Sequence, residues 1–279
     1  MNTILYATNR TKNAVPALRY AYDLSKSLGA ELVILYVYQK PPIRFSMARL
    51  PDQMEHQVIE EQKEILRAYC SKYLGEEFKT SRMRIEIACN DSVLDGIIEK
   101  SKQISPDMAL IGRKAGDSER GLLVGDIAHA LLKRSAFPIL IIPQDLSGFP
   151  IQTMLYANNL GEVSILSIKN LVTIAKSVNA KIHIVHISTE SRNSKKDQIK
   201  WFKETLKEHV DYDNIEIKVI LSNHIEESLK IYSQHIKADI LAMVYKQEKR
   251  FFHNLFNKSL VKKLDTHIGI PLMGIRAAV

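Results

Sequence analysis

The densest group of residues that could bind a ligand is a run of glycines near the middle of the chain. Four of the eleven glycines fall close together: Gly112, Gly116, Gly121 and Gly125. Glycine lets backbone N–H groups approach a phosphate, and a helix after such a loop presents free N–H groups and the positive end of its dipole. The same glycines could equally form turns and a cap. We favour an anion site, present or ancestral, because a parallel sheet would place its ligand at this loop.

Other patterns that carry chemistry are missing. The sequence contains no GxxxxGK[ST], GxGxxG, GxSxG or HExxH, so the common nucleotide, esterase and zinc-protease motifs are absent. His183 and His186 lie three apart in an expected strand and should point to opposite faces, which argues against a shared metal. Cys70 and Cys89 form no CxxC pair and fit a reducing compartment. We expect no catalytic residue and no metal site.

The segment Lys246–Lys263 is basic, with Glu248 as its single acidic residue, and it carries three phenylalanines. Such a segment could bind RNA or single-stranded DNA by stacking, could form an anion site, or could be a solvated loop whose phenylalanines cover the core. The solvated loop is favoured and nucleic acid is the least favoured. The net charge of +8 does not change this, because acidic residues are interspersed along most of the chain.

The chain repeats itself once. Two segments recur 150 residues further on, and two later ones recur 132 or 133 residues further on. The pairs are Ile4–Asn9 with Met154–Asn159, Ala30–Val37 with Ala180–Ile187, Pro106–Ile111 with Ala238–Met243, and Pro138–Leu140 with Pro271–Met273. The change of spacing predicts an insertion of about 18 residues in the first copy, at the Pro-rich stretch Lys40–Pro51.

Short apolar runs alternate with amphipathic stretches within each copy. The first copy predicts strands over Thr3–Thr8, Glu31–Tyr38, Arg82–Ala88, Asp107–Gly112 and Ile139–Ile142, and helices over Ala14–Leu28, Asp52–Leu74, Ser92–Ser105 and Gly121–Ser135. Strand–helix alternation predicts a parallel sheet with right-handed crossovers. We therefore expect an α/β protein of two tandem, five-stranded, parallel, doubly wound domains, residues 1–144 and 148–279, joined near Gln144–Phe149.

Ligands of an open parallel sheet bind beyond the carboxyl ends of its strands, where the strand order reverses. The loops expected there in the first copy are Ala7–Lys12 and Gly112–Gly125. These are the loops after the first and fourth strands.

In these loops the sequence resembles the universal stress protein family, in its tandem two-domain form. The resemblance covers nearly the whole chain. It rests on the opening strand with its Ala/Leu-rich helix, the strand ending in Tyr36-Val37, the Pro106-Asp107 pair before the fourth strand, and the closing segment Phe137–Ile142. It implies Rossmann-like domains of the adenine-nucleotide α-hydrolase-like class.

Nucleotide-binding members of this family carry G-x2-G-x9-G-S/T after the fourth strand and an aspartate after the first. Gly112 and Gly125 match the first and last glycines, while Ala115 stands at the middle one. Asp126 replaces the hydroxyl residue and Asn9 replaces the aspartate. The resemblance thus implies a degenerate site for ATP or a related adenine nucleotide, formed by Ala7, Thr8, Asn9, Val37, Gly112, Arg113, Ala115, Gly125, Asp126 and Ile127.

These departures weaken the implied site. A carboxylate at Asp126, about 4 Å from a phosphate, would oppose binding by roughly 4 kcal/mol at an effective dielectric of about 20, although Arg113 and Lys114 could offset it. Ala115 matters if the lost glycine had a positive φ. Asn9 would be a neutral and weaker acceptor for a ribose than an aspartate.

In the second copy the equivalent loop, Val244–Ser259, contains no glycine. Lys258 stands at the last glycine, Ser259 keeps the hydroxyl, and Asn159 again replaces the aspartate. We expect weak nucleotide binding in the first half and a lost site in the second.

The resemblance implies a stress-response protein that is not an enzyme and acts through a ligand or an unknown protein partner. Two alternatives stay open: a scaffold for protein or nucleic-acid partners without nucleotide, and, less favoured, a slow nucleotide hydrolase. The sequence shows no apolar run long enough for a membrane span and no signal peptide, so we expect a cytoplasmic protein.

The closing strands of the two halves, Ile139–Ile142 and Pro271–Ile275, are short and apolar and would be exposed edges in separate domains. Such strands make the dimer contact in the resembled family. We expect them to satisfy each other within this chain as a pseudo-dimer, so that a homodimer would need another surface.

Overall fold

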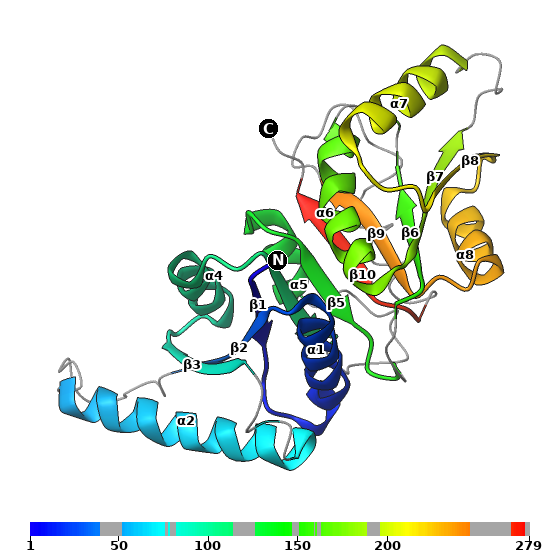
Figure 1. Cartoon of the computed structure of the whole chain (residues 1–279). Helices are drawn as coiled ribbons and strands as arrows, with labels where there is room; N and C mark the ends of the chain where they lie inside the picture. The colour runs from blue at the N-terminus through cyan, green and yellow to red at the C-terminus, as the bar shows by residue number, and fades with distance from the viewer. Residues whose placement is uncertain are drawn as a thin grey trace.

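The computed structural model describes residues 1–39, 52–75, 78, 82–113, 126–146, 151–158, 160, 163–188, 196–245 and 269–276. Figure 1 shows the two halves of the chain side by side, joined where β5 and β10 meet. The stretch Lys40–Pro51 and the basic segment Lys246–Lys263 lie outside the described residues, so the interpretations given to them stay predictions.

Ten strands form one sheet in the order β3-β2-β1-β4-β5-β10-β9-β6-β7-β8. The strands are β1 (Thr3–Ala7), β2 (Glu31–Tyr38), β3 (Met83–Cys89), β4 (Met108–Gly112), β5 (Ile139–Ile142), β6 (Thr153–Ala157), β7 (Lys181–Ser188), β8 (Ile215–Leu221), β9 (Ile240–Tyr245) and β10 (Leu272–Arg276). Neighbouring strands are parallel except β5 and β10, which are antiparallel. The strand order therefore repeats in mirror sequence about the junction, as a duplication predicts.

Helices cover both faces of this sheet (Figure 1). They are the short η1 (Lys12–Ala14), then α1 (Val15–Leu28), α2 (Asp52–Leu74), α4 (Val93–Ile104), α5 (Asp126–Arg134), α6 (Val163–Val178), α7 (Lys196–His209) and α8 (Ile225–His235). α1 begins with a proline in its first turn and ends at Gly29, which has a φ of 62° and donates its N–H to the Lys26 carbonyl. The doubly wound parallel fold predicted from the sequence is confirmed.

Alternate residues of the strands enter two apolar layers. Ile4 and Tyr6 face the layer made with α1, α2, α6 and α7, whereas Leu5 faces the layer made with α4, α5 and α8. Because both faces are covered, the inner strands β1, β2 and β4 show no polar alternation, whereas the outer strands β3 and β8 do. Each layer contains residues of both halves, so the apolar packing continues across the junction.

The closing strands pair as predicted, with Leu272 opposite Ile141 and Gly274 opposite Ile139. A Cβ at Gly274 would lie 2.0 Å from Cδ2 of Leu132 on α5, so a larger residue there would displace the Leu132 side chain. The inner edges of the two halves are thus closed within one chain.

The duplication is visible in the backbone itself. Six of the eight described residues with positive φ form matching pairs: Arg10 with Leu160, both 59°, Gly29 with Asn179, 62° and 54°, and Ser105 with Lys237, both 51°. The aspartate before the fourth strand of each half makes the same contacts in both halves. Oδ2 of Asp107 accepts from the N–H groups of Asn2 and Thr3 at 2.6 and 3.0 Å, and Oδ2 of Asp239 accepts from those of Gln152 and Thr153 at 2.7 and 2.8 Å. The boundaries 1–144 and 148–279 stay predictions.

None of the helices in the described part of the chain combines the length and the apolar character needed to cross a membrane.

Candidate functional site

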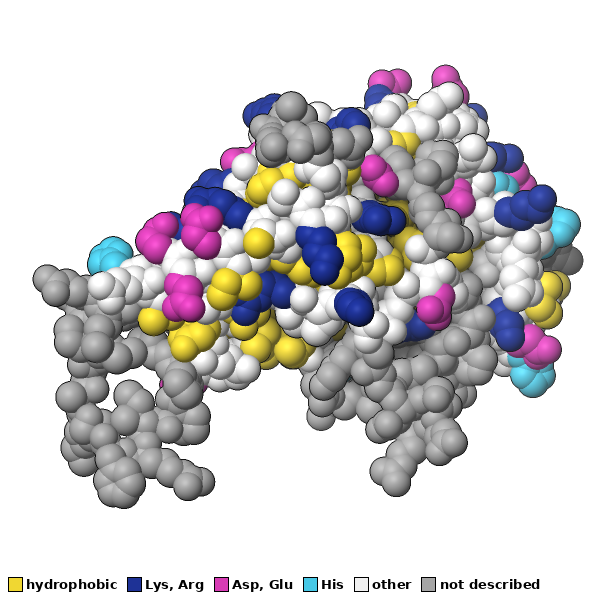
Figure 2. Space-filling model, turned by 90° about the horizontal axis from the view of Figure 1, so that it is seen from below, with side chains coloured by type: hydrophobic (Ala, Val, Ile, Leu, Met, Phe, Trp, Pro, Cys, Tyr) yellow, Lys and Arg dark blue, Asp and Glu magenta, His cyan; other side chains and the backbone are white. Residues whose placement is uncertain are grey.

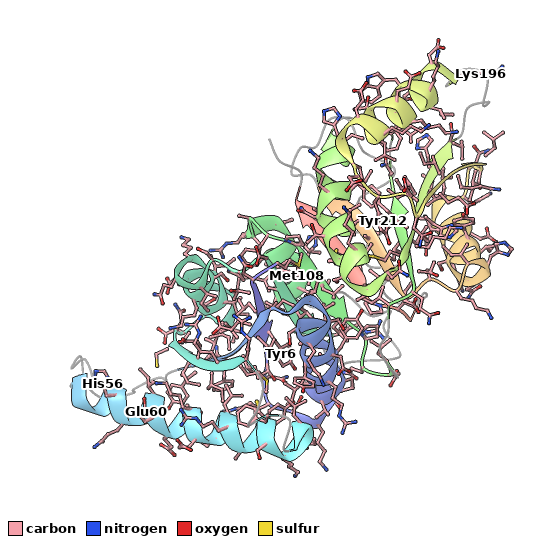
Figure 3. The ribbon with its side chains drawn as sticks, viewed as in Figure 1. Tyr6, His56, Glu60, Met108, Lys196 and Tyr212 are labelled. Atoms are coloured by element: carbon pink, nitrogen blue, oxygen red, sulfur yellow. The ribbon has the colours of Figure 1, made fainter. Side chains whose placement is uncertain are left out.

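The carboxyl ends of β1, β2 and β4 lie next to one another. Ala7, the last residue of β1, is opposite Leu35 on one side and Ile111 on the other. Gly112 ends β4 beside Ile142. In Figure 3, Tyr6 and Met108 mark opposite ends of these strands, Tyr6 near the carboxyl end of β1 and Met108 at the amino end of β4. The predicted loops after β1 and β4 therefore start at one edge of the sheet.

The loop after β1 is held by its own side chains. The Thr8 N–H donates to the Leu35 carbonyl at 2.9 Å, and Oγ1 of Thr8 accepts from the Arg10 N–H at 3.1 Å. Oδ1 of Asn9 accepts from the N–H and the hydroxyl of Thr11 at 3.2 and 2.9 Å. The amide oxygen of Asn9, expected to face a ribose, is engaged in its own turn, which leaves only its NH2 group for a ligand.

Two tyrosines that the sequence reasoning did not single out support the same loop. The Tyr6 hydroxyl donates to the Ala14 carbonyl at 2.7 Å, and the Tyr69 hydroxyl of α2 donates to the Thr11 carbonyl at 3.3 Å. Burial raises the pKa of Tyr6 far above its usual value and that of Tyr69 to about 12, so both stay neutral donors. A tyrosine inside an otherwise apolar strand was the available signal for Tyr6.

Arg10 is the other residue that sequence reasoning missed. Its Cζ lies 3.5 Å from the centre of the Tyr36 ring, and Tyr36 is near the carboxyl end of β2. The Nη1 atom of Arg10 is buried and has no hydrogen-bond acceptor in the described part of the chain. A basic residue directly after the first strand was the signal that could have found it.

Val37 does not offer an open surface. Its side chain is 6% exposed and packs beneath α4, where a Cβ at Gly96 would lie 2.6 Å from Cγ1 of Val37. Val37 therefore positions α4 against β2, and any contact with an adenine would use the rim of this buried side chain.

The loop after β4 is described only at its two ends. The Arg113 N–H donates to the Ile142 carbonyl at 2.8 Å, and its carbonyl accepts from Nε2 of Gln144 at 3.0 Å. Asp126 is the first described residue of α5, and Ile127 next to it is 40% exposed. The predicted site residues Ala115 and Gly125 lie outside the described residues, so the glycine loop stays a prediction.

The matching turn of the second half has a different interior. Oδ1 of Asn158 accepts from the Leu160 N–H, as Thr8 does from Arg10. Leu160, at the position of Arg10, is fully buried, and Nδ1 of His186 donates to the Asn158 carbonyl at 2.9 Å. An apolar side chain thus occupies the place of the cation. The predicted counterpart Asn159 lies outside the described residues.

Other candidate groups behave as packing or surface residues. His183 and His186 point to opposite faces as predicted, since His183 contacts Tyr232 of α8 and His186 contacts the turn after β6. No group of three or more His, Cys, Asp and Glu within the described ranges could hold a metal ion. Cys70 is buried, which raises the pKa of its thiol to about 12. Glu60 and Glu64 of α2 pair with Lys63 and Arg67, as residues of a solvated face do.

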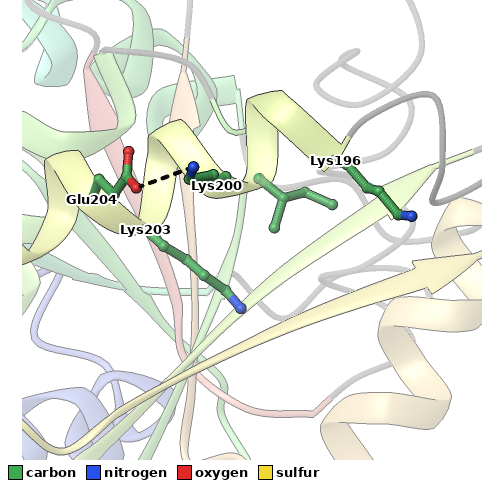
Figure 4. A pocket seen from close by; sticks show the side chains of 5 residues that line it. Lys196, Lys200, Lys203 and Glu204 are labelled. Carbon is green, nitrogen blue, oxygen red and sulfur yellow. Dashed lines mark ion pairs between the residues drawn. The ribbon is translucent and has the colours of Figure 1, made fainter.

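Two surface hollows of the described part of the chain lie away from this edge. One is lined by five residues of α7, among them Lys196, Lys200 and Lys203, and Lys200 forms an ion pair with Glu204 one turn further along the helix (Figure 4). Figure 2 shows positive and negative side chains interspersed on the face seen from below, with apolar side chains between them. Neither feature supplies a set of converging groups that would rival the carboxyl edge.

The fold defines a doubly wound, parallel α/β protein built by duplication. The model of the universal stress protein family matches residues 1–143, and the chain belongs to this family. No curated protein gives a significant match.

Several solved structures share the fold at low identity. A universal stress protein from Archaeoglobus fulgidus DSM 4304 has a TM-score of 0.72 at 14% identity, with 99% of each chain covered. A protein of unknown function from Pseudomonas aeruginosa PAO1 has a TM-score of 0.66 at 12% identity, covering 99% of this chain and 93% of that one. The cytoplasmic domain of a prokaryotic cation chloride cotransporter has a TM-score of 0.54 at 10% identity, covering 98% and 94%. The whole two-half arrangement therefore recurs in other proteins.

Proposed function

We propose that this chain is a non-catalytic stress-response protein whose first half binds an adenine nucleotide, ATP or a relative of it, weakly at the carboxyl edge of β1, β2 and β4. Membership of the universal stress protein family supports the class of function. The proposal assigns a cytoplasmic location, a ligand or protein partner as the signal, and no bond-making step.

The observation that carries the proposal is the adjacency of the two loops. Ala7 and Gly112 end neighbouring parallel strands at the reversal of strand order, which is where doubly wound sheets bind their ligands. α5 follows the second loop and is described from Asp126, so the proposal places the amino end of this helix, with its free N–H groups, at the same edge.

Two features keep the proposed affinity low. The amide oxygen of Asn9 is already bonded to Thr11, so a ribose gains only a donor from this residue. Asp126 stands in the sequence where nucleotide-binding members of the family carry a hydroxyl residue, and a negative charge at this position would oppose a phosphate.

Thermal unfolding with and without ATP tests the proposal. A ligand at 100 times its Kd stabilises the folded state by about 2.7 kcal/mol, which raises the midpoint by several degrees. Millimolar ATP should therefore raise the unfolding temperature, and AMP should do the same.

The same experiment separates the alternatives. No shift with any adenine nucleotide would contradict the proposal and favour a scaffold for protein or nucleic-acid partners. Release of phosphate from ATP that scales with protein concentration would favour the slow hydrolase. Binding to RNA with a steep dependence on salt would favour the nucleic-acid form of the scaffold.

A further inference from the structure

Arg10 has an arrangement that the fold alone does not require. The backbone of Arg10 has a φ of 59°, and its N–H donates to Oγ1 of Thr8, which fixes the turn. From this turn the guanidinium reaches the Tyr36 ring, with 3.5 Å between Cζ and the ring centre. This distance fits a stacked cation, in which the ring holds the guanidinium and leaves its N–H groups free to donate in their own plane.

One of these donors is buried without an acceptor. Nη1 of Arg10 is shielded from water, and neither an ion pair nor a side-chain hydrogen bond reaches it from the described residues. Buried polar groups are almost always hydrogen-bonded, and a charged donor is the costliest to leave unpaired. An anionic oxygen is the partner that such a donor favours.

The second half provides an internal comparison. Leu160 has the same φ of 59° in the matching turn, yet it is a fully buried hydrocarbon side chain. His186 lies at the position of Tyr36 and donates to the turn instead of stacking beneath a cation. The turn therefore folds without arginine, so the stacked cation of the first half is available for another role.

We propose that Arg10 binds the phosphate of the ligand at the carboxyl edge of the first half, and that the ligand is a phosphate monoester. This inference rests on the proposed nucleotide site and moves its main anion contact from the glycine loop to the stacked guanidinium. The shared chemistry is a dianionic phosphate, whether on a nucleoside monophosphate or free in solution. A planar fork of N–H donors suits such oxygens in pairs.

Isothermal titration of the full chain at low salt with AMP, adenosine and inorganic phosphate tests the inference. AMP should bind at least about tenfold more tightly than adenosine, and phosphate should compete with AMP. Arg10→Leu, which copies Leu160, should weaken AMP binding about 10- to 100-fold and leave adenosine binding unchanged. Arg10→Lys should fall between, because it keeps the charge and loses the fork.

Lys12→Leu is the matched control. It removes the same charge from an exposed position at the start of η1, two residues further along the chain, and AMP affinity should stay within about twofold because exposed charges contribute little. Should Arg10→Leu unfold, Tyr36→Leu serves as the second variant: it removes the stack and should weaken AMP binding, whereas Tyr36→Phe keeps the ring and should not.

The outcomes separate this inference from the proposed function. Equal binding of AMP and adenosine, unaffected by Arg10→Leu, would overturn the inference and leave nucleotide binding standing. Phosphate binding that needs Arg10, with no gain from the adenosine part of AMP, would support the inference and overturn the adenine site. No binding of any of the three compounds would overturn both.

Discussion

Arg10 and Leu160 occupy equivalent turns with the same positive φ, yet one side chain is a stacked cation and the other is buried among apolar residues. A non-glycine residue in this region costs of order 1–3 kcal/mol. In both turns a side-chain oxygen two residues earlier, on Thr8 or Asn158, accepts the N–H and holds the conformation. The backbone conformation of the turn is therefore the same in both halves, whereas the charge that the turn presents depends on the one side chain at this position.

The departures from the family pattern in the glycine loop give the first residue-scale prediction. The double variant Ala115→Gly, Asp126→Ser restores the middle glycine and replaces the carboxylate at the start of α5 by a hydroxyl. ATP affinity measured by calorimetry should rise at least about tenfold, since removing one like charge near a phosphate is worth more than 1.4 kcal/mol. Asp145→Ser, which removes an exposed carboxylate after β5, should change nothing. Unchanged affinity in the double variant would refute the explanation from these two side chains.

His183 gives a prediction on pH. Its Nδ1 lies 3.1 Å from the Tyr232 hydroxyl and 3.8 Å from Glu216, with Lys181 on the same face of β7. Burial lowers the pKa of His183, and Lys181 lowers it further, against the opposite effect of Glu216. The native state therefore releases its proton more readily than the unfolded chain, whose histidine has a pKa of about 6.5.

Stability from His183 is thus fully present above about pH 6.5 and is lost as the pH falls through the lower native pKa. Urea unfolding of the wild type should show a decline between about pH 7.5 and 5 that is smaller in His183→Gln. His209→Gln, an exposed histidine at the end of α7, is the control and should keep the wild-type decline. Identical pH profiles for His183→Gln and the wild type would contradict this account.

At the scale of elements, the strands differ from their predicted ranges by one residue at most in the first half. β2 and β5 begin and end as predicted, while β1 ends at Ala7 and β3 runs over Met83–Cys89. The predictions succeed because each strand is a short apolar run bounded by a cap or turn residue. α5 is described only from Asp126, so the predicted start of its helix at Gly121 is untested.

The carboxylates before the fourth strand of each half give the element-scale prediction. Asp107 and Asp239 each accept two N–H groups at the amino end of the first strand of their half. Asp107→Asn and Asp239→Asn should each lower the free energy of unfolding by about 1 kcal/mol, because a neutral amide is the weaker acceptor. Urea midpoints measure the loss. The control is Asp211→Asn, which changes an exposed carboxylate paired with Lys176 and should leave the midpoint unchanged. If the midpoint of this control falls as far as those of Asp107→Asn and Asp239→Asn, the contacts at the strand ends have no specific role.

At the scale of the whole molecule, the junction of β5 and β10 joins the halves in one sheet. Gly274→Ala would force its new Cβ against Leu132 of α5, and overpacking of this kind costs about 1–3 kcal/mol. Adding Leu132→Ala should restore part of the lost free energy of unfolding. The double variant should then be more stable than the summed losses of the two single variants predict. Additive losses would show that the strand and helix do not press on each other at this point.

The site could be predicted only in part. The sequence predicted correctly that the loops after β1 and β4 start at one edge of the sheet, because this follows from strand order alone, while ligand binding at that edge stays a prediction. It did not predict that Asn9 turns its oxygen onto Thr11, that Val37 is buried under Gly96, or that Arg10 stacks on Tyr36. These are choices of side-chain partner, and several partners are compatible with the same local pattern.

Taken by itself, the sequence determined the alternation of strands and helices, the duplication and the family of this protein, because apolar periodicity, caps and repeated segments are local properties of the chain. Only the tertiary structure decided the antiparallel register of Ile141 with Leu272, the continuity of the apolar layers and the pairing of Arg10 with Tyr36. Each of these joins residues from separate elements, and their contact depends on the packing of the whole sheet rather than on the residues next to them in the chain.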